Sequence, residues 1–244
     1  MKAIILAAGI GKRLRPITNS IPKPMIKIYD KPILEYIVND LVNFGFDEIC
    51  IVIGYNGNQI KKYFRSGDKF NAKISYVIQK EYKGTAYAVM CAKDFVGYDK
   101  FLLHLGDAIN PDALKEHVND MLEDESDIDI ISTKIDVSKA KYVGNIKTRG
   151  DYIVKITEKS PQSTSNLSWA GVALFKDNRI FKKISELNPS NTGEYEITEA
   201  INNTLSEGTV VKNHICKKSI DVGTPRGVKK AWDWKKEQIQ KNVR

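Results

Sequence analysis

KAIILAAGIGKRLRPITNSIPKPMIK, residues 2–27, is the stretch of sequence that decides the fold. Residues 3–8 form an apolar run, which predicts a buried strand, and a glycine-containing loop with Lys12 and Arg13 follows at once. Lys23 comes next, between two prolines. A strand that ends in exposed backbone N–H groups beside several fixed cations is typical of a phosphate-binding site. We therefore expect phosphate to bind near residues 9–23.

Length and composition indicate a globular α/β protein. The 244 residues suffice for one large domain, and no linker, repeat or low-complexity stretch divides them, so we expect a single domain over 1–244. Hydrophobic residues make up 42% and charged residues 28%, which is ordinary for such a protein. No apolar run approaches the roughly 18 residues of a membrane span. The apolar N-terminus is interpreted as a first core strand instead of a signal peptide.

Charge and cysteine content exclude further classes. The formal net charge is +8, but the lysines are spread along the chain, and the single local run lies in the last predicted helix. We interpret that run as a solvated helix face and expect no nucleic-acid partner. Cys50, Cys91 and Cys216 are odd in number and far apart, which predicts neither disulfides nor a zinc site. Three small buried side chains in a reducing cytoplasm are the expected arrangement.

Periodicity predicts a doubly wound, mostly parallel, Rossmann-like mixed sheet. In the first half, to about residue 125, apolar strands alternate with helical patterns, which indicates parallel pairing with right-handed crossovers. The half from about residue 126 is richer in strands. The predicted strands are 3–8, 49–53, 74–78, 101–105, 129–135, 143–148, 152–157, 170–175 and 209–216. The predicted helices are 33–44, one within 54–64, 85–95, 111–123, 177–187, 196–206 and 225–241, and 160–168 is a polar loop.

Two familiar glycine motifs are absent from the N-terminal stretch. A P-loop would need a glycine where Leu6 stands and Ser or Thr where Arg13 follows Lys12. A dinucleotide fingerprint would need a glycine at Leu14. Gly9 and Gly11 alone are therefore a weak signal, and the longer string has to carry the interpretation.

That longer string resembles the sugar-1-phosphate nucleotidylyltransferases, which join a sugar 1-phosphate to a nucleoside triphosphate and release pyrophosphate. The N-terminal matches are LAAGIGKRLRPIT (6–18) and PKPMIKIYDKPILEY (22–36). Further matches follow in the family's order: Gln79 with KGTAYAV (83–89), LGD (105–107), EK (158–159), AGVALF (170–175), EITEAI (196–201) and DVGTP (221–225). The resemblance covers nearly the whole chain. It implies a nucleotide-binding half to about residue 125 and a sugar-phosphate-binding half beyond it.

The resemblance implies roles for residues of the first half. The nucleotide-binding residues that it implies are Leu6, Ala8, Gly9, Gly11, Lys12, Arg13, Gln79, Gly84 and Thr85. Arg13 can make a bidentate contact with the β/γ phosphate oxygens, and Lys23 would be a second catalytic cation. Gln79 can pair with a base edge, and a side chain at Gly84 would collide with the base. A glutamine at this position favours dTTP or UTP.

Two aspartates and four other residues complete the implied site. Asp107 and Asp221 each follow an apolar strand, and the family holds Mg²⁺ with carboxylates at these positions. The implied sugar-phosphate residues are Gly144, Glu158, Lys159 and Gly171. Ser160 replaces the proline that usually follows the EK motif. Three further departures touch this pocket: Trp169 replaces an asparagine, Ser219-Ile220 replaces a segment with tryptophan, and the YVGN segment (142–145) holds an extra residue. They leave the identity of the sugar open.

Other polar residues have a plainer interpretation. Asp127-Ile128-Asp129 matches the DxD of many glycosyltransferases, but it lies beside an acidic helix end and is interpreted as surface. His104, His117 and His214 follow no partner pattern, and we expect His104 to pack in the core.

The resemblance implies a cytoplasmic, Mg²⁺-dependent enzyme that makes an NDP-sugar and pyrophosphate, with dTTP or UTP and glucose 1-phosphate favoured. The alternatives are a mannose-1-phosphate guanylyltransferase or another acceptor-specific relative, and a non-catalytic nucleotide-sugar-binding subunit. Retention of Arg13, Lys23, Asp107 and Asp221 argues against the last. The partners are small molecules, with no membrane, and the sequence leaves open whether the chain forms a homo-oligomer.

Overall fold

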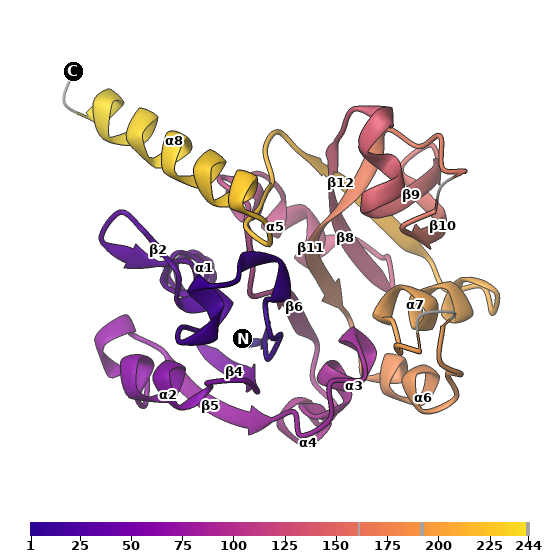
Figure 1. The fold of residues 1–244 in the computed structure, drawn as a ribbon. Coiled ribbons are helices and arrows are strands. Elements are labelled where there is room, and N and C mark those ends of the chain that lie inside the picture. The colour runs from indigo at the N-terminus through magenta and orange to yellow at the C-terminus, as the bar shows by residue number, and fades with distance from the viewer. Residues whose placement is uncertain (161, 191–192, 243–244) are drawn as a thin grey trace.

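A nine-stranded mixed sheet runs through the molecule. The computed structural model describes residues 1–160, 162–190 and 193–242. The sheet strands are β1 (Lys2–Ala7), β4 (Glu48–Ile53), β5 (Lys73–Ile78), β6 (Phe101–Leu105), β8 (Ile128–Lys134), β9 (Gly144–Arg149), β10 (Tyr152–Glu158), β11 (Leu167–Phe175) and β12 (Val211–Cys216). Their order across the sheet is β5-β4-β1-β6-β11-β8-β12-β10-β9 (Figure 1).

Strand direction divides the sheet into two regions. β5, β4, β1 and β6 are all parallel, as the alternation of strands and helices predicts. β11 then runs antiparallel to both β6 and β8, and β10 runs antiparallel to β12 and β9. β12 and β8 are parallel. The predicted α/β class with a mixed sheet is confirmed.

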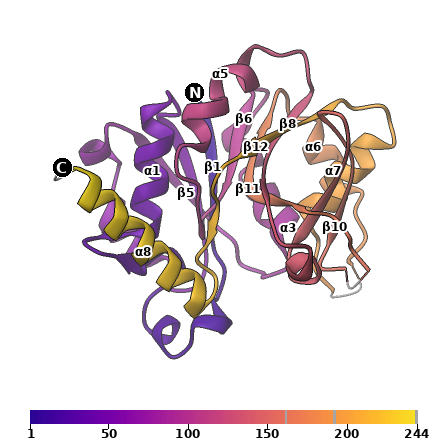
Figure 2. The same ribbon diagram turned by 90° about the horizontal axis from the view of Figure 1, so that it is seen from above.

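Helices cover both faces of the sheet (Figure 2). One core cluster contains side chains of α1 (Ile33–Asn43), α2 (Asn58–Phe64), α5 (Ala113–Glu123) and α8 (Pro225–Asn242). The other contains side chains of α3 (Thr85–Met90), α4 (Lys93–Val96), α6 (Arg179–Ser185) and α7 (Ile197–Leu205). β1 contributes to both clusters because successive side chains of a strand point to opposite faces. This double coverage explains why β1 is almost entirely apolar.

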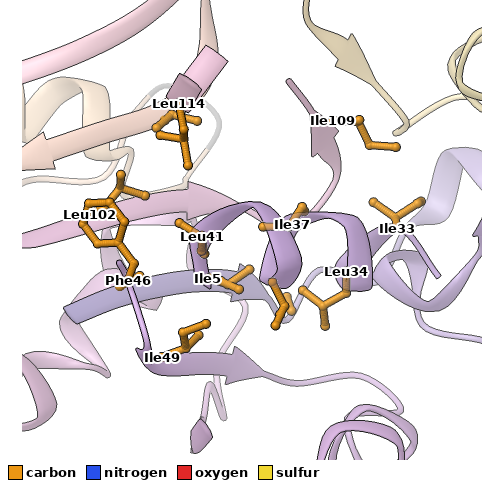
Figure 3. Close-up of a cluster of buried hydrophobic side chains, with 14 of the residues drawn as sticks. Ile5, Ile33, Leu34, Ile37, Leu41, Phe46, Ile49, Leu102, Ile109 and Leu114 are labelled. Carbon is orange, nitrogen blue, oxygen red and sulfur yellow. The ribbon is translucent and has the colours of Figure 1, made fainter. Parts of the chain in front are cut away.

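The packing of α1 shows how the sequence pattern sets the core (Figure 3). Leu34, Ile37 and Leu41 recur at helical spacing and lie fully or nearly fully buried against the sheet, close to Ile5 and Ile49. Each such side chain contributes about 1.5–3 kcal/mol by leaving water. The helix ends as predicted, because Gly45 adopts a left-handed φ of 83° just beyond it. The loops that carry the site are thus attached to a rigid body.

Several local predictions were wrong. The single helix predicted over 85–95 is two helices, since α3 stops at Met90 and the N–H of Ala92 bonds the carbonyl of Val89, three residues back, at 3.0 Å. Two small antiparallel sheets were not predicted: β2 (Lys27–Ile28) with β3 (Lys31–Pro32), and β7 (Ala108–Ile109) with β13 (Ile220–Asp221). Strands of two residues have no periodicity to read.

The interpretation of Asp129 as a surface residue was also wrong. Its side chain is fully buried in β8, and its Oδ1 lies 2.7 Å from Nε2 of His214 in β12. Lys176 Nζ lies 3.2 Å from the other oxygen. β8 is flanked on both sides by other strands, so a side chain there that points into the layer of helices cannot reach solvent.

Three further predictions concern the polar loop, the cysteines and membrane-spanning helices. The predicted polar loop 160–168 ends earlier, because β11 begins at Leu167, and residue 161 lies outside the described residues. Cys50 and Cys216 are buried as expected, whereas Cys91 is half-buried, and all three are free. In the described part of the chain, every helix is too short or too polar to cross a membrane.

Candidate active site

The loop after β1 is folded back on itself. Thr18 Oγ1 donates a hydrogen bond of 2.8 Å to the carbonyl of Gly11, and the buried Leu14 anchors a short 3₁₀ turn, Lys12–Leu14. Gly11 has φ of 70°, and a Cβ there would lie 3.0 Å from Thr18. A Cβ on Gly9 would meet nothing within 4 Å. The backbone at Gly9 is therefore open to an incoming group.

A cavity of about 410 Å³ lies beside this loop. It brings together eight of the nine residues predicted to bind nucleotide, and it also contains Lys23; the eight are Leu6, Ala8, Gly9, Gly11, Lys12, Gln79, Gly84 and Thr85. Three of the segments that line it come directly after the carboxyl ends of β1, β5 and β6. Ligands of parallel α/β sheets bind at these strand ends. We call this space the nucleotide cavity. Arg13 is the one predicted nucleotide residue that does not line it.

The turn before α3 closes one end of the nucleotide cavity. Gln79 is 5% exposed, and its Nε2 lies 3.4 Å from the carbonyl of Gly84. Gly84 has φ of 103°, and a Cβ would lie 2.6 Å from the carbonyl oxygen of Tyr195. The backbone of Tyr195 therefore leaves no room for a side chain at position 84, independently of any contact with a bound base. Thr85 Oγ1 donates to Glu196 Oε2 at 2.8 Å, which joins this turn to the sugar-side half.

A second cavity of about 330 Å³ adjoins the first. It contains all four predicted sugar-phosphate residues and Asp221: Gly144, Glu158, Lys159, Gly171 and Asp221 line it, together with Arg13. The two cavities share four residues: Thr85, Leu105, Asp107 and Glu194. We call the second space the sugar cavity. Asp107 thus faces both spaces, at their junction.

The small β7–β13 sheet brings the two predicted metal carboxylates together. Asp221 pairs with Ala108, and the N–H of Val222 donates to the carbonyl of Asp107 at 2.8 Å. The key neighbour is Gly223. A Cβ on it would lie 2.7 Å from Nη2 of Arg13, 2.8 Å from Oδ1 of Asp221 and 3.5 Å from Oδ2 of Asp107. One guanidinium and two carboxylates therefore converge on a space that any side chain at 223 would fill.

This arrangement fits a hard divalent cation. Two carboxylates from different segments supply oxygen donors, and Mg²⁺ prefers one or two carboxylates completed by water and phosphate oxygens. The space beside Gly223 is where such an ion could be held between Asp107 and Asp221. Asp107 and Asp221 therefore offer the type of oxygen donor that Mg²⁺ prefers, and the magnesium site stays a prediction.

Cations already surround Asp107. Lys23 Nζ forms an ion pair with its Oδ2, and the 3₁₀ turn Lys23–Met25 positions this lysine after the extended Pro22. Burial alone would raise the pKa of Asp107, but Lys23 and Arg13 outweigh it and hold the pKa below its ordinary value. Asp107 is therefore an anion at neutral pH.

The β9–β10 hairpin builds one wall of the sugar cavity. Gly144 pairs with Glu158, and a Cβ on Gly144 would lie 3.0 Å from Glu158 Oε1. Thr198 Oγ1 donates to the same oxygen at 3.2 Å. Burial raises the pKa of Glu158, although Lys159 and Thr198 oppose the shift. Lys159 itself has a left-handed φ of 40°, an uncommon backbone for a lysine.

A bulge in β11 forms the opposite wall. The pairing with β8 shifts between Trp169 and Val172, and Gly171 between them has φ of 81°. Trp169 Nε1 donates to the carbonyl of Val172 at 2.9 Å, which fixes the indole on the cavity wall. Ser219 lines the same cavity, but Ser160 lines a separate polar cavity. The three departures expected at the sugar pocket, in the YVGN segment, at Trp169 and at Ser219-Ile220, all have residues that line this cavity.

Comparison with known proteins decides the family. The family model described as nucleotidyl transferase matches residues 2–236, nearly the whole chain. The chain belongs to the nucleotidyl transferase family. This nucleotidyl transferase is 35% identical over 229 residues to UTP–glucose-1-phosphate uridylyltransferase AglF of Haloferax volcanii, covering 92% of each chain.

Two further comparisons show how far the likeness extends. Low-salt glycan biosynthesis nucleotidyltransferase Agl11 of Haloferax volcanii is 35% identical over 220 residues, which cover 88% of this chain and 60% of that relative. The chain thus spans about 60% of the length of Agl11. A solved structure of UDP-glucose pyrophosphorylase with UDP-glucose superposes with a TM-score of 0.86 at 25% identity, covering 97% of this nucleotidyl transferase and 98% of that chain.

Sequence reasoning missed three residues of the site. Gly223 lies inside the recognised DVGTP string, yet its role depends on what surrounds it in space. Glu194 and Glu196 line the sugar cavity near the start of α7. Burial raises the pKa of Glu196, and the neighbouring carboxylates Glu158 and Glu194 add to the shift. The EITEAI string contains Glu196, so the signal for this residue was present in the sequence.

Proposed function

We propose that this protein is a Mg²⁺-dependent sugar-1-phosphate nucleotidylyltransferase, which forms an NDP-sugar and pyrophosphate. One observation carries the proposal: two adjoining cavities share Asp107, and Arg13, Asp221 and Asp107 converge at Gly223. A transferase of this kind has to hold two anionic substrates in contact, with positive charge over the reacting phosphate. Family membership and the placement of the predicted residues support the same reaction.

We propose dTTP or UTP as the nucleotide and glucose 1-phosphate as the acceptor. Gln79, nearly buried at the end of β5, offers both a donor and an acceptor to a base edge. AglF is named as a uridylyltransferase that acts on glucose 1-phosphate, and it matches this chain over almost its full length. In the sugar cavity, Glu158 would accept hydrogen bonds from sugar hydroxyls.

The proposed reaction is a single in-line displacement. A phosphate oxygen of the sugar 1-phosphate attacks the α-phosphorus of the triphosphate; the new P–O bond forms as the bond to the β-phosphate oxygen breaks. Arg13 and Lys23 neutralise the leaving pyrophosphate, and Lys159 orients the attacking phosphate. Mg²⁺ held by Asp107 and Asp221 would supply further positive charge next to the phosphate oxygens.

A substrate matrix tests the proposal. Four nucleoside triphosphates are combined with glucose, mannose and amino-sugar 1-phosphates, with Mg²⁺ or with EDTA, and pyrophosphate release is measured. We expect release with UTP or dTTP plus glucose 1-phosphate, and none with EDTA. Release that favours GTP and mannose 1-phosphate would replace the substrates but keep the reaction. Binding of a nucleotide sugar without any release would identify a non-catalytic subunit.

A further inference from the structure

Lys23 and Asp107 neutralise each other's charge in an ion pair. Their ion pair joins Nζ to Oδ2, and the exposed fractions of the two side chains are 16% and 21%, so water screens the pair only partly. The proposed function requires different partners for the two groups. Lys23 should hold the triphosphate, and Asp107 should hold the divalent cation.

We propose that Lys23 occupies the place of the metal on Asp107 until a triphosphate draws it away, so that nucleotide and divalent cation bind as a coupled pair. This inference rests on the proposed function. It assigns Lys23 a second role, in metal binding, beyond its contact with the leaving pyrophosphate.

Charge competition is the physical basis. Lys23 lines the nucleotide cavity beside Gly11 and Lys12, so phosphates that enter there lie within its reach. A triphosphate carries several negative charges, whereas Asp107 offers one, so the ammonium moves to the phosphates. Asp107 and Asp221 are then left with Arg13 as their nearby cation, and their attraction for a divalent ion rises. Linkage requires that the metal strengthens nucleotide binding by the same factor.

The neighbouring charges provide matched controls. Lys12 also lines the nucleotide cavity, but it is exposed and makes no ion pair within the described residues. Asp221 carries the same charge as Asp107, but its Oδ1 accepts a 2.7 Å hydrogen bond from the N–H of Gly223 and no described lysine pairs with it. Substitution of Lys12 or Asp221 therefore changes the same net charge without removing the competing pair.

Binding measurements without turnover test the inference. Mn²⁺ is titrated by calorimetry and by electron paramagnetic resonance into the full chain, with and without UTP or dTTP. Lys23→Met should raise the Mn²⁺ affinity of the nucleotide-free protein about tenfold, whereas Lys12→Met should leave it within about twofold. Lys23→Arg should keep the wild-type affinity because it retains the ion pair.

Titration of nucleotide into the metal-free protein provides a second test. With EDTA present, Asp107→Asn should tighten UTP or dTTP binding more than Asp221→Asn does, since only the first variant releases Lys23. In Lys23→Met, the ratio of Mn²⁺ affinities with and without nucleotide should fall about tenfold toward one. Circular dichroism confirms that each variant is folded.

The outcomes separate the two proposals. If Lys23→Met binds Mn²⁺ no more tightly than wild type, or if Asp107→Asn and Asp221→Asn affect metal-free nucleotide binding equally, the coupling is overturned. If the wild-type protein binds neither Mn²⁺ nor UTP nor dTTP, the proposed function itself fails. The Asp107→Asn arm decides the matter if Lys23→Met does not fold.

Discussion

The two halves of the molecule build their cavities in different ways. The nucleotide cavity lies where the parallel strands β1, β5 and β6 end, so many of its residues come from the loops that follow these three strands. The sugar cavity is formed by the antiparallel β9–β10 hairpin, a bulge in β11 and the approach to α7. The first arrangement follows from a general rule of α/β sheets. The second depends on pairings particular to this chain.

The difference suggests a division of labour. Substitutions in the first half should act on nucleotide binding, and those in the second half on sugar binding. Residues at the junction should act on the chemical step, because Asp107 faces both cavities and Asp221 adjoins it.

Loss of a junction carboxylate should have the largest effect. Asp107→Asn or Asp221→Asn should lower kcat by about 10³-fold, since each removes charge that stabilises the transition state. Pyrophosphate release at saturating concentrations of both substrates measures the effect. Asp94→Asn, an exposed aspartate on α4, should change kcat by less than about twofold and serves as the control. Normal kcat in either junction variant would mean that metal binds elsewhere.

The space beside Gly223 should be the next most sensitive feature. Gly223→Ala places a Cβ less than 3 Å from both Arg13 and Asp221, so one of these groups has to move. We expect kcat to fall about 10²-fold, with both KM values nearly unchanged. A Cβ on Gly9 meets nothing within 4 Å, so the effect of Gly9→Ala should appear in the nucleotide KM instead. Equal kcat losses in both variants would argue against a special role for Gly223.

The division also explains which features the sequence revealed. The strand–loop order of the first half predicted the parallel sheet, and the residues around Gly9, Gln79 and Thr85 all reach one cavity. The bulge at Gly171 and the pairing of Asp129 with His214 were not predicted, since both depend on which strands become neighbours in space. Features that depend on residues close together in the sequence could therefore be predicted, whereas contacts between distant strands could not.

Gly223 and the two-residue strands show the same limit. β7 and β13 have only two residues each, and their pairing joins segments more than a hundred positions apart. No local pattern encodes such a contact, so the sequence indicated Asp107 and Asp221 through resemblance alone. The convergence of Arg13 with both aspartates became visible only in the folded chain.

Substrate-specific KM values should separate the halves more finely. Glu158→Gln should raise KM for the sugar 1-phosphate about tenfold and leave KM for the nucleotide within about twofold, because it weakens a charged hydrogen-bond acceptor in one cavity only. Gln79→Ala should show the opposite pattern. Initial rates with each substrate varied in turn provide both values. A joint rise in both KM values for either variant would contradict two independently built cavities.

The smallest predicted effect concerns the half-buried carboxylate of Asp40, which differs from the fully buried Asp129 in its partners. Asp129 is paired with His214 and Lys176, whereas Asp40 on α1 lies near Asp112, and burial together with that second carboxylate raises the pKa of Asp40 to about 7. A raised carboxyl pKa means that the folded state retains a proton that the unfolded state has lost between about pH 4 and pH 7.

The contribution of Asp40 to stability is therefore greatest at low pH and declines as pH rises through about 7. Asp40→Asn keeps a neutral side chain at every pH, so it should stabilise the protein by about 1 kcal/mol at pH 8, after allowance for solvent screening, and by much less at pH 5. Thermal melts of both proteins across this range measure the difference. Lys31 and Lys235 line the same cavity as Asp40 and Asp112, and if either lysine already neutralises the pair, the difference between variant and wild type will not grow with pH.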